Sequence, residues 1–374
     1  MPQTRTDPEV ETLLRQLDGA LGGGEPLLLT PVDPAQLAEH PEVALVLATS
    51  GSSTGQGRPV GLSAAALRAS AHGTQERLAG PGQWLLTLPP QHVAGIQVLA
   101  RSVLAGTVPV CTGRDGSPPQ ALAEAIAQMR TDVPRYVSLV PTQLVRALRS
   151  ETAVAALRSC AAVLVGGAAT PTAVLTSARA AGIAVVTTYG MTETCGGCVY
   201  DGVPLAGAQV RLGTGGRVLL AGPMLAEGYL DDGPQPFTEV DGTRWLRTGD
   251  AGTVTGGVLT LAGRIDDVIV TGGVNVHPAA VEQRLAGLAE VAEVCVVGVP
   301  DPEWGELLTA VVVPVAGRAV RLERLRTEAG GGPSAPRAVV TVGSLPLRGP
   351  GKTDRRAVAE LAAERLARGD GQRH

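Results

Sequence analysis

The sequence predicts an α/β fold: a large N-terminal domain of parallel strands flanked by helices with a small β unit, then a small α+β C-terminal domain. Two observations lead to this prediction. Between residues 43 and 187, continuous apolar runs of strand length alternate with helix-like segments, which is typical of a parallel sheet covered on both faces. From 207 to 263, shorter runs alternate with glycine pairs, which indicates antiparallel strands.

The elements of the large domain follow in order. A short amphipathic helix is expected at 9–21, where Gly22-Gly23-Gly24 ends it. Ligands of parallel sheets lie beyond the carboxyl ends of the strands, so we expect chemistry in the loops that follow the apolar runs. The expected strands are Val43–Ala48, Trp84–Leu88, Thr107–Cys111, Tyr136–Val140, Ala161–Val165 and Ile183–Thr187, and the helices are 63–78, 93–105, 118–130, 142–157 and 171–181.

The second half of the chain changes its pattern twice. The small β unit comes first, and after Arg264 helices and strands mix again. We therefore divide the chain into a domain at 1–263 and a domain at 264–374. The β unit is predicted from runs at Ala208–Leu212, Arg217–Ala221 and Val258–Ala262, and the second domain from a helix near 278–288, strands at Val291–Val299, Leu308–Val313 and 338–342, and a helix at 354–367.

Composition narrows the class of protein. Hydrophobic residues make up 44% and charged residues 18% of the 374 residues, which is typical of a globular protein. The net charge of −4 provides no basic footprint for nucleic acid. The first ten residues lack the apolar segment of a signal peptide, and Gln97 and Arg101 interrupt the longest apolar stretch. We therefore expect no membrane span and a cytoplasmic location; the oligomeric state stays open, a homo-oligomer included.

The cysteines are few and dispersed, which fits a reducing compartment. Cys195 and Cys198 have the spacing of a zinc knuckle or a redox pair. No second pair or Cys/His partner lies at ligand spacing, so a structural role is favoured for both, with a metal or redox role as the alternative.

A loop rich in hydroxyl residues and glycine follows the first expected strand, at 49–59. Glycines let backbone N–H groups close around an anion, and hydroxyls add donors. The loop is not a Walker phosphate loop, because Gln56 stands five residues after Gly51 and no lysine follows. We expect a nucleotide phosphate site of another kind, with a plain polar surface loop as the alternative. The candidate ligands are Thr49, Ser50, Gly51, Ser52, Ser53, Thr54, Gly55 and Arg58.

Three further loops carry groups that suit a nucleotide. Tyr189, at a strand end, can stack on a base, and Glu193, among hydroxyl residues, can hold a hard cation such as Mg²⁺. Gly166-Gly167 ends the fifth expected strand without side-chain bulk, so a flat ring could lie on that backbone. Asp250 follows a turn glycine, and carboxylates commonly bind ribose hydroxyls.

Lys352 is the only lysine of the chain; all the other residues among its 31 lysines and arginines are arginine. An ammonium is a compact charge on a flexible stem, whereas a guanidinium is a planar fork. Gly351-Lys352-Thr353 looks like the end of a Walker loop, but Pro346 stands where that motif requires glycine. Lys352 can be interpreted either as a residue that contacts a small anion or as a surface lysine without a function.

These motifs, in this order, resemble the acyl-adenylate-forming superfamily, which includes acyl-CoA synthetases, luciferases and the adenylation domains of peptide synthetases. The resemblance implies an enzyme that uses ATP and Mg²⁺, with CoA as a co-substrate, and a C-terminal domain that is mobile. It runs from 49 to 356 through the hydroxyl-rich loop, Tyr189-Gly-Met-Thr-Glu193, Arg247-Thr-Gly-Asp250, Gly263-Arg-Ile-Asp-Asp267, Thr271-Gly-Gly-Val-Asn275 and Gly351-Lys352.

The resemblance also implies a role for each position. The loop at 49–58 would hold the ATP phosphates, although Gly57-Arg58-Pro59 replaces the family's usual Pro-Lys pair. Lys352 would bind the reacting carboxylate and the α-phosphate oxygens. Tyr189 and Gly167 would flank adenine, Asp250 and Arg264 would hold ribose, Glu193 would reach Mg²⁺, and Ala168, Gly190, Met191 and Thr192 would complete the ATP site, with Asp266 as the hinge and Gly272 and Gly273 at the pantetheine arm of CoA.

Two basic residues indicate the acid. His92 follows the second expected strand, and Arg101 lies nine residues later in an otherwise apolar helix. A buried cation needs a partner, which the second carboxylate of a dicarboxylic acid would supply. This layout resembles the o-succinylbenzoate-CoA ligase family of menaquinone biosynthesis. The expected acid site is His92, also taken as catalytic, with Arg101, Gly166 and Gly190; a structural histidine and an intrachain salt bridge of Arg101 are the alternatives.

The expected reaction has two steps. The acid carboxylate attacks the α-phosphate of ATP and releases pyrophosphate; the small domain then turns about Asp266, withdraws Lys352 and lets the CoA thiol displace AMP. One rival is an adenylating enzyme for another acid or for loading a carrier protein. The other is a non-catalytic regulatory protein that binds nucleotide.

Overall fold

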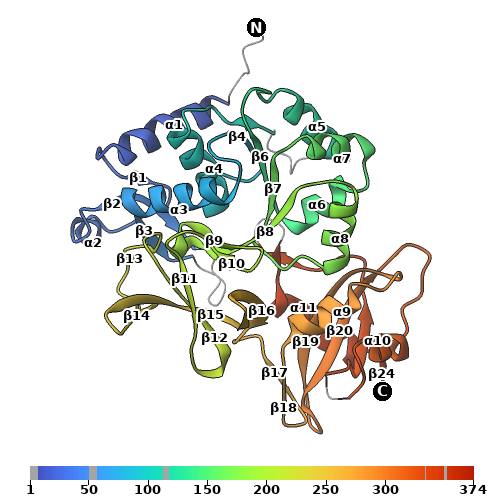
Figure 1. Cartoon of the computed structure of the whole chain (residues 1–374). Coiled ribbons are helices and arrows are strands. Elements are labelled where there is room, and N and C mark those ends of the chain that lie inside the picture. The colour runs from blue at the N-terminus through green and yellow to red at the C-terminus, as the bar shows by residue number, and fades with distance from the viewer. Residues whose placement is uncertain (1–6, 50–56, 113–117, 333, 349–351) are drawn as a thin grey trace.

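The computed structural model describes residues 7–49, 57–112, 118–332, 334–348 and 352–374 (Figure 1). The predicted α/β architecture is confirmed, with helices around parallel strands, a small β unit and a C-terminal α+β part. In the described ranges, no helix is long and apolar enough to cross a membrane. The phosphate-loop candidates Ser50, Gly51, Ser52, Ser53, Thr54 and Gly55 lie outside the described residues.

A seven-stranded sheet forms the centre of the large part, in the order β10-β9-β8-β7-β6-β4-β5. Neighbouring strands from β5 to β8 are parallel, and β9 and β10 are antiparallel. Five of the six predicted strands therefore lie in this sheet. Their bounds are β4 (Gln83–Leu86), β5 (Val110–Cys111), β6 (Arg135–Leu139), β7 (Ala162–Val165) and β8 (Val185–Met191), followed by β9 (Gly196–Tyr200) and β10 (Val203–Pro204).

The central strands bury both faces, as their unbroken apolar runs predict. Trp84 and Leu86 of β4 pack into one core and Leu85 packs into another, because successive side chains point to opposite faces. The predicted helix at 142–157 is two helices, and Ser150 caps the second by accepting a hydrogen bond from Ala153 N. The first core lies under α1 (Pro8–Leu21), α3 (Ala64–Arg77) and α4 (Val93–Leu104), and the second under α5 (Pro119–Ala127), α6 (Pro141–Ala147), α7 (Glu151–Arg158) and α8 (Thr172–Ala180).

The first predicted strand lies in a different sheet, so its assignment to the parallel sheet was wrong. β2 (Val43–Ala48) pairs antiparallel with β3 (Pro59–Ser63). The connection at 49–58 is shorter than the dozen or more residues that a parallel crossover needs, so the two strands pair as a hairpin. The four strands of this sheet are β1 (Leu27–Leu28), β2, β3 and β13 (Gly228–Tyr229), and α2 (Pro34–Ala38) precedes β2.

The small β unit is antiparallel throughout, as expected. The C-terminal part lies at the lower right of Figure 1, in orange and red. The β unit consists of β11 (Gln209–Leu212), β12 (Arg217–Ala221), β14 (Phe237–Val240), β15 (Thr243–Thr255) and β16 (Val258–Arg264). The C-terminal part consists of β17 (Ile269–Thr271), β18 (Val274–Val276), α9 (Pro278–Leu285), β19 (Val291–Asp301), β20 (Gly305–Pro314), α10 (Leu322–Glu328), β21 (Ala338–Thr341), β22 (Leu347–Arg348), β23 (Lys352–Thr353), α11 (Arg355–Ala367) and β24 (Gly371–Arg373).

Candidate active site

Three residues that the sequence assigned to the nucleotide meet at the end of β8. Tyr189 donates its hydroxyl to Asp250 Oδ2 at 2.8 Å. Asp250 stands opposite Arg264 in the β15–β16 pair, and its Oδ1 lies 3.8 Å from Arg264 Nη1. Burial, and then the nearby Asp250 carboxylate, raise the pKa of the Tyr189 phenol far above its ordinary value. The hydroxyl is therefore a donor at any working pH, and it fixes the Asp250 carboxylate.

Arg264 also contacts the predicted hinge residue. Its Nη2 donates to Asp266 Oδ2 at 3.3 Å. One arginine thus links the ribose candidate Asp250 with the hinge candidate. Close by, β16 meets α9, where a Cβ on Gly263 would lie 3.2 Å from Ala279 Cβ.

Glycine is required on both sides of Tyr189 because two backbones approach closely. A Cβ on Gly166, after β7, would lie 2.1 Å from Thr188 Oγ1, and a Cβ on Gly190 would lie 2.0 Å from the Gly196 carbonyl oxygen. Protein atoms fill those two spaces, whereas a Cβ on Gly167 would meet only Val140 Cγ1 at 3.8 Å, so the backbone at Gly167 has room for a flat ring. Of the neighbouring candidates, Gly167 and Ala168 are exposed, Met191 is half-buried and Thr192 is buried.

Glu193 lies directly after β8, in the 3₁₀ turn η1 (Thr192–Thr194). Its Oε1 accepts a hydrogen bond from the Tyr229 hydroxyl at 2.6 Å. Within the described part of the chain, no three His, Cys, Asp or Glu side chains gather as a metal cage. Mg²⁺ that arrives with a nucleotide needs only one or two carboxylates, since phosphates and water fill its shell. Glu193 fits that mode of binding.

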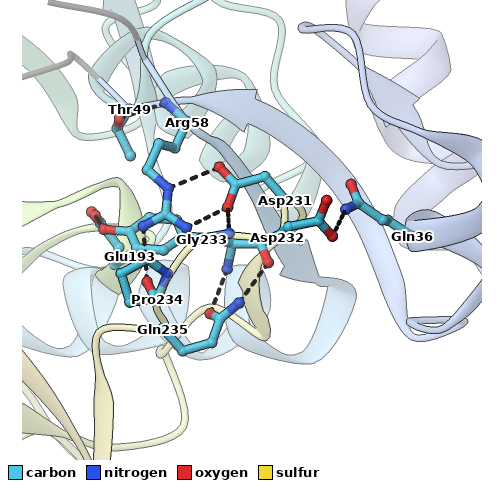
Figure 2. Close-up of polar contacts among 10 residues, drawn as sticks. Gln36, Thr49, Arg58, Glu193, Asp231, Asp232, Gly233, Pro234 and Gln235 are labelled. Atoms are coloured by element: carbon cyan, nitrogen blue, oxygen red, sulfur yellow. Dashed lines mark hydrogen bonds and ion pairs between the residues drawn. The ribbon is translucent and has the colours of Figure 1, made fainter. Parts of the chain in front are cut away.

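Arg58 ends the connection at 49–58, and its guanidinium is engaged by protein groups (Figure 2). Its Nε donates to Asp231 Oδ2 at 2.8 Å, its Nη1 donates to the Pro234 carbonyl at 2.9 Å, and its Nη2 donates to Asp231 Oδ1. The guanidinium also lies 3.7 Å from the centroid of the Tyr229 ring. Its backbone N–H donates to Thr49 Oγ1 at 3.0 Å. A phosphate contact of Arg58 stays a prediction.

Arg101 is buried in α4, the helix for which His92 is the N-cap residue. It is 4% exposed. Its Nη2 donates to the Tyr200 hydroxyl over 3.4 Å, and its guanidinium lies 4.9 Å from the Trp84 ring centroid. Its Nε is buried without a hydrogen-bond partner, and it forms no ion pair with a described carboxylate. The intrachain salt bridge considered from the sequence is thus absent from the described residues.

Gln97 is a further candidate site residue. In the sequence it stood out only as a polar residue that interrupts the longest apolar stretch. It lies one helical turn before Arg101 and is 1% exposed. Neither its Oε1 nor its Nε2 has a hydrogen-bond partner among the described residues. Its Cγ would lie 3.3 Å from a Cβ on Gly196, which pairs with Met191. The four-residue spacing places Gln97 and Arg101 on the same face of the helix. This spacing is the feature of the sequence that could have identified Gln97.

Cys195 and Cys198 are both buried. Cys195 packs in the core under α3 and α4, whereas Cys198 packs in the core of the small β unit. Both thiols are free. Burial raises the pKa of both, that of Cys198 to about 12, whereas a redox or metal-binding thiol needs a lowered pKa.

The C-terminal candidates lie on two short hairpins. Gly272 and Gly273 form the turn between β17 and β18, and a Cβ on Gly272 would lie 2.9 Å from the Trp304 ring. Lys352 begins β23, opposite Arg348 of β22. The roles of Lys352 in adenylation and of the two glycines in CoA binding stay predictions.

Comparison with known proteins identifies relatives over most of the chain. The family described as AMP-binding enzyme matches residues 4–230, and the AMP-binding enzyme C-terminal domain matches residues 280–352. A protein of Mycobacterium tuberculosis named "Probable 2-succinylbenzoate–CoA ligase" is 43% identical, over 94% of this chain and 95% of its own length.

Two solved structures are similar in fold. The o-succinylbenzoate CoA synthetase MenE of Bacillus subtilis, solved with the acyl-adenylate intermediate OSB-AMP, has a TM-score of 0.72 and 26% identity, over 84% of this chain and 69% of that chain. MenE of Escherichia coli, solved with a phenylether-linked analogue of OSB-AMS, has a TM-score of 0.66 and 30% identity, over 86% of this chain and 70% of that chain.

Proposed function

Because this chain belongs to the AMP-binding enzyme family, we propose that it is an AMP-forming acid–CoA ligase whose acid is o-succinylbenzoate. The main support is the 43% identity to the Mycobacterium tuberculosis relative, which extends over nearly the full length of both chains. The buried Arg101 supports a dicarboxylic acid, because an unpaired guanidinium in a protein interior is costly and a second substrate carboxylate would pair with it.

We assign nucleotide binding to the residues at the end of β8. Asp250, fixed by Tyr189 and Arg264, would accept hydrogen bonds from ribose hydroxyls. Adenine would lie between the Tyr189 ring and the backbone of Gly167 and Ala168, beside Gly190, Met191 and Thr192. Thr49 and the hydroxyl residues at 50–54 would surround the phosphates. Glu193 would hold Mg²⁺, which neutralises charge on the phosphates when bound.

The proposed reaction begins when the acid carboxylate attacks the α-phosphorus of ATP. A new O–P bond forms, the bond to the bridging oxygen breaks, and pyrophosphate leaves. Lys352 would stabilise the negative charge on the α-phosphate oxygens, and His92 would border the acid. The C-terminal part would then turn about Asp266, bringing Gly272 and Gly273 to CoA. The thiol attacks the acyl carbon, loses its proton to water and displaces AMP. We place this reaction in the cytoplasm.

The proposal is tested with a panel of acids. Purified enzyme is given ATP, Mg²⁺, CoA and either o-succinylbenzoate, benzoate, cinnamate or a fatty acid, and pyrophosphate release and CoA-thioester formation are measured. We expect both products with o-succinylbenzoate at a kcat/KM at least tenfold above that of any monocarboxylic acid. Pyrophosphate release without a thioester would favour a carrier protein or another acceptor. Failure of every acid would overturn o-succinylbenzoate as the substrate and leave an enzyme for another acid or a non-catalytic nucleotide-binding protein.

Lys352→Ala tests whether Lys352 acts in adenylation and not in thioester formation. We expect adenylation to fall by about a thousandfold, as when one stabiliser of transition-state charge is removed, and thioester formation from supplied acyl-AMP to stay within about threefold of wild type. Arg356→Ala is the matched control, because this nearby cation is exposed and its one ion pair among the described residues is with Glu360. Equal losses in both half-reactions would show that Lys352 is not specific to adenylation.

A further inference from the structure

The side chain of Arg58 braces the segment at 229–235 (Figure 2). Two parallel hydrogen bonds join its guanidinium to Asp231, and a third reaches the Pro234 carbonyl. Bidentate arginine–carboxylate pairs are strong and fix orientation as well as distance. Hydrogen bonding to Arg58 holds the pKa of Asp231 below its ordinary value, so the pair stays charged near neutral pH. These contacts leave Arg58 poorly placed to turn toward a phosphate.

Arg58 and Gln235 hold Tyr229 in place. The guanidinium of Arg58 lies 3.7 Å from the centroid of its ring. Gln235 fixes its backbone, because Gln235 Oε1 accepts from Tyr229 N at 2.9 Å and Gln235 Nε2 donates to the Tyr229 carbonyl at 2.8 Å. These contacts fix the position of the Tyr229 hydroxyl, which donates to Glu193 Oε1.

The acceptor of that hydroxyl is Glu193, the candidate Mg²⁺ ligand. Oε1 of Glu193 receives the hydrogen bond at 2.6 Å, and this is the only side-chain hydrogen bond of Glu193 among the described residues. A carboxylate oxygen has more than one lone pair, so the group keeps acceptor capacity for a metal. Loss of a partner that orients a metal ligand typically lowers metal affinity or activity by about 10- to 100-fold.

We propose that Tyr229 is a positioning residue for the metal-binding carboxylate, and that the Arg58–Asp231 pair braces Tyr229. Tyr229 fixes the side chain of Glu193, so that binding of Mg²⁺ with the nucleotide does not have to order it. This inference deepens the proposed function and rests on its assignment of Glu193 to Mg²⁺. Neither Tyr229 nor Asp231 was a candidate from the sequence.

The experiment measures binding rather than turnover. Calorimetric titration with α,β-methylene-ATP, with and without Mg²⁺, gives the gain in nucleotide affinity that the metal supplies. Tyr229→Phe removes the hydroxyl and keeps the ring; we expect the Mg²⁺-dependent gain to fall roughly tenfold. Tyr136→Phe is the matched control, because this buried tyrosine donates to the Gly80 carbonyl at 2.8 Å outside the candidate site, and it should leave the gain unchanged. An equal gain in wild type and Tyr229→Phe would overturn the proposal.

The brace is tested in the same titration with Asp231→Asn, which preserves shape and removes the charge. We expect a two- to fourfold smaller Mg²⁺-dependent gain and no change in affinity for the metal-free analogue. Asp132→Asn is its control, since Asp132 pairs with Arg130 on the exposed surface. If Asp231→Asn showed the same Mg²⁺-dependent gain in nucleotide affinity as the wild type, the bracing role of the Arg58–Asp231 pair would be overturned. A weaker metal-free affinity in Asp231→Asn would indicate direct phosphate binding by a released Arg58 or a disturbed loop, and would also overturn it.

The outcomes separate this inference from the proposed function, because the titration contains neither acid nor CoA. If no acid is adenylated but Tyr229→Phe loses the Mg²⁺-dependent gain, the positioning role holds and the proposed reaction fails. If o-succinylbenzoate is converted and Tyr229→Phe keeps the full gain, the reaction holds and the positioning role fails.

Discussion

Two arginines of the large part are used in opposite ways. Arg58 is a quarter exposed, at 27% of its side chain, and three of its nitrogens donate to protein oxygens. Arg101 is 4% exposed, and its one described hydrogen bond, to the Tyr200 hydroxyl, is 3.4 Å long. The more accessible cation is thus fully paired, and the buried one is not.

This contrast inverts what electrostatics alone would favour. Burial of a charge is costly unless it is paired, whereas an exposed charge is already stabilised by water. A buried and poorly paired Arg101 is therefore a cost to the folded protein that a ligand can offset. The pairing of Arg58 stabilises a local structure. We infer that Arg58 holds the site in place and that Arg101 recognises the acid.

The largest expected effect is on substrate choice at Arg101. Arg101→Ala should raise KM for o-succinylbenzoate by about 100-fold, because loss of one partner of a buried charge pair costs about 2–5 kcal/mol. KM for a monocarboxylic aromatic acid should change by less than about threefold, since that acid has no second carboxylate. Steady-state kinetics on both acids measure this. Arg68→Ala is the control, as Arg68 donates to the Leu21 carbonyl outside the site. Equal changes for both acids would remove Arg101 from substrate recognition.

Replacing Arg101 or Arg58 by methionine should change the free energy of unfolding of the protein in different directions. Arg101→Met keeps an unbranched apolar side chain and removes a buried unpaired charge, so the free energy of unfolding should stay level or rise by about 1 kcal/mol. Arg58→Met removes a bidentate pair and leaves Asp231 without its partner. The free energy of unfolding of this variant should therefore fall by about 1–2 kcal/mol. Urea unfolding of the ligand-free protein measures both. A destabilised Arg101→Met would mean that the contacts of Arg101 with Tyr200 and Trp84 stabilise the fold by more than burial of its charge costs.

Double-mutant cycles compare the pairs directly. Arg58→Met with Asp231→Asn should show a coupling of about 1 kcal/mol, because each single change breaks the same hydrogen bonds. Arg101→Met with Tyr200→Phe should couple by less than about 0.5 kcal/mol, because the hydrogen bond between them is long and poorly formed. A coupling of similar size in the two cycles would contradict the contrast.

Much of the scaffold could be predicted because its signals are local. Apolar runs locate the parallel strands; Tyr189 lies near the end of β8, and Glu193 lies in the turn that follows it. The confirmed family explains why Asp250 and Arg264 were assigned to one site. The sheet that contains β2 was misassigned, because the length of an apolar run does not show which strand it pairs with. Tyr229 and Asp231 were missed because they act across 36 and 173 residues of sequence, through side chains without periodicity.

The smallest expected effect is in the pH dependence of these stabilities. Arg58 lowers the pKa of Asp231, first through hydrogen bonding, so the folded pKa lies below the unfolded value of about 3.9. A lowered carboxyl pKa contributes stability that is complete above the unfolded pKa and is lost as pH falls through the folded pKa. The stability difference between wild type and Arg58→Met should therefore be constant from pH 8 to 5 and shrink below about pH 4. The difference for Arg101→Met should not shrink, because no described carboxylate pairs with Arg101. Urea unfolding at pH 7, 5 and 3.5 measures both differences. Parallel acid profiles for the two variants would mean that a titrating carboxylate pairs with Arg101 as well.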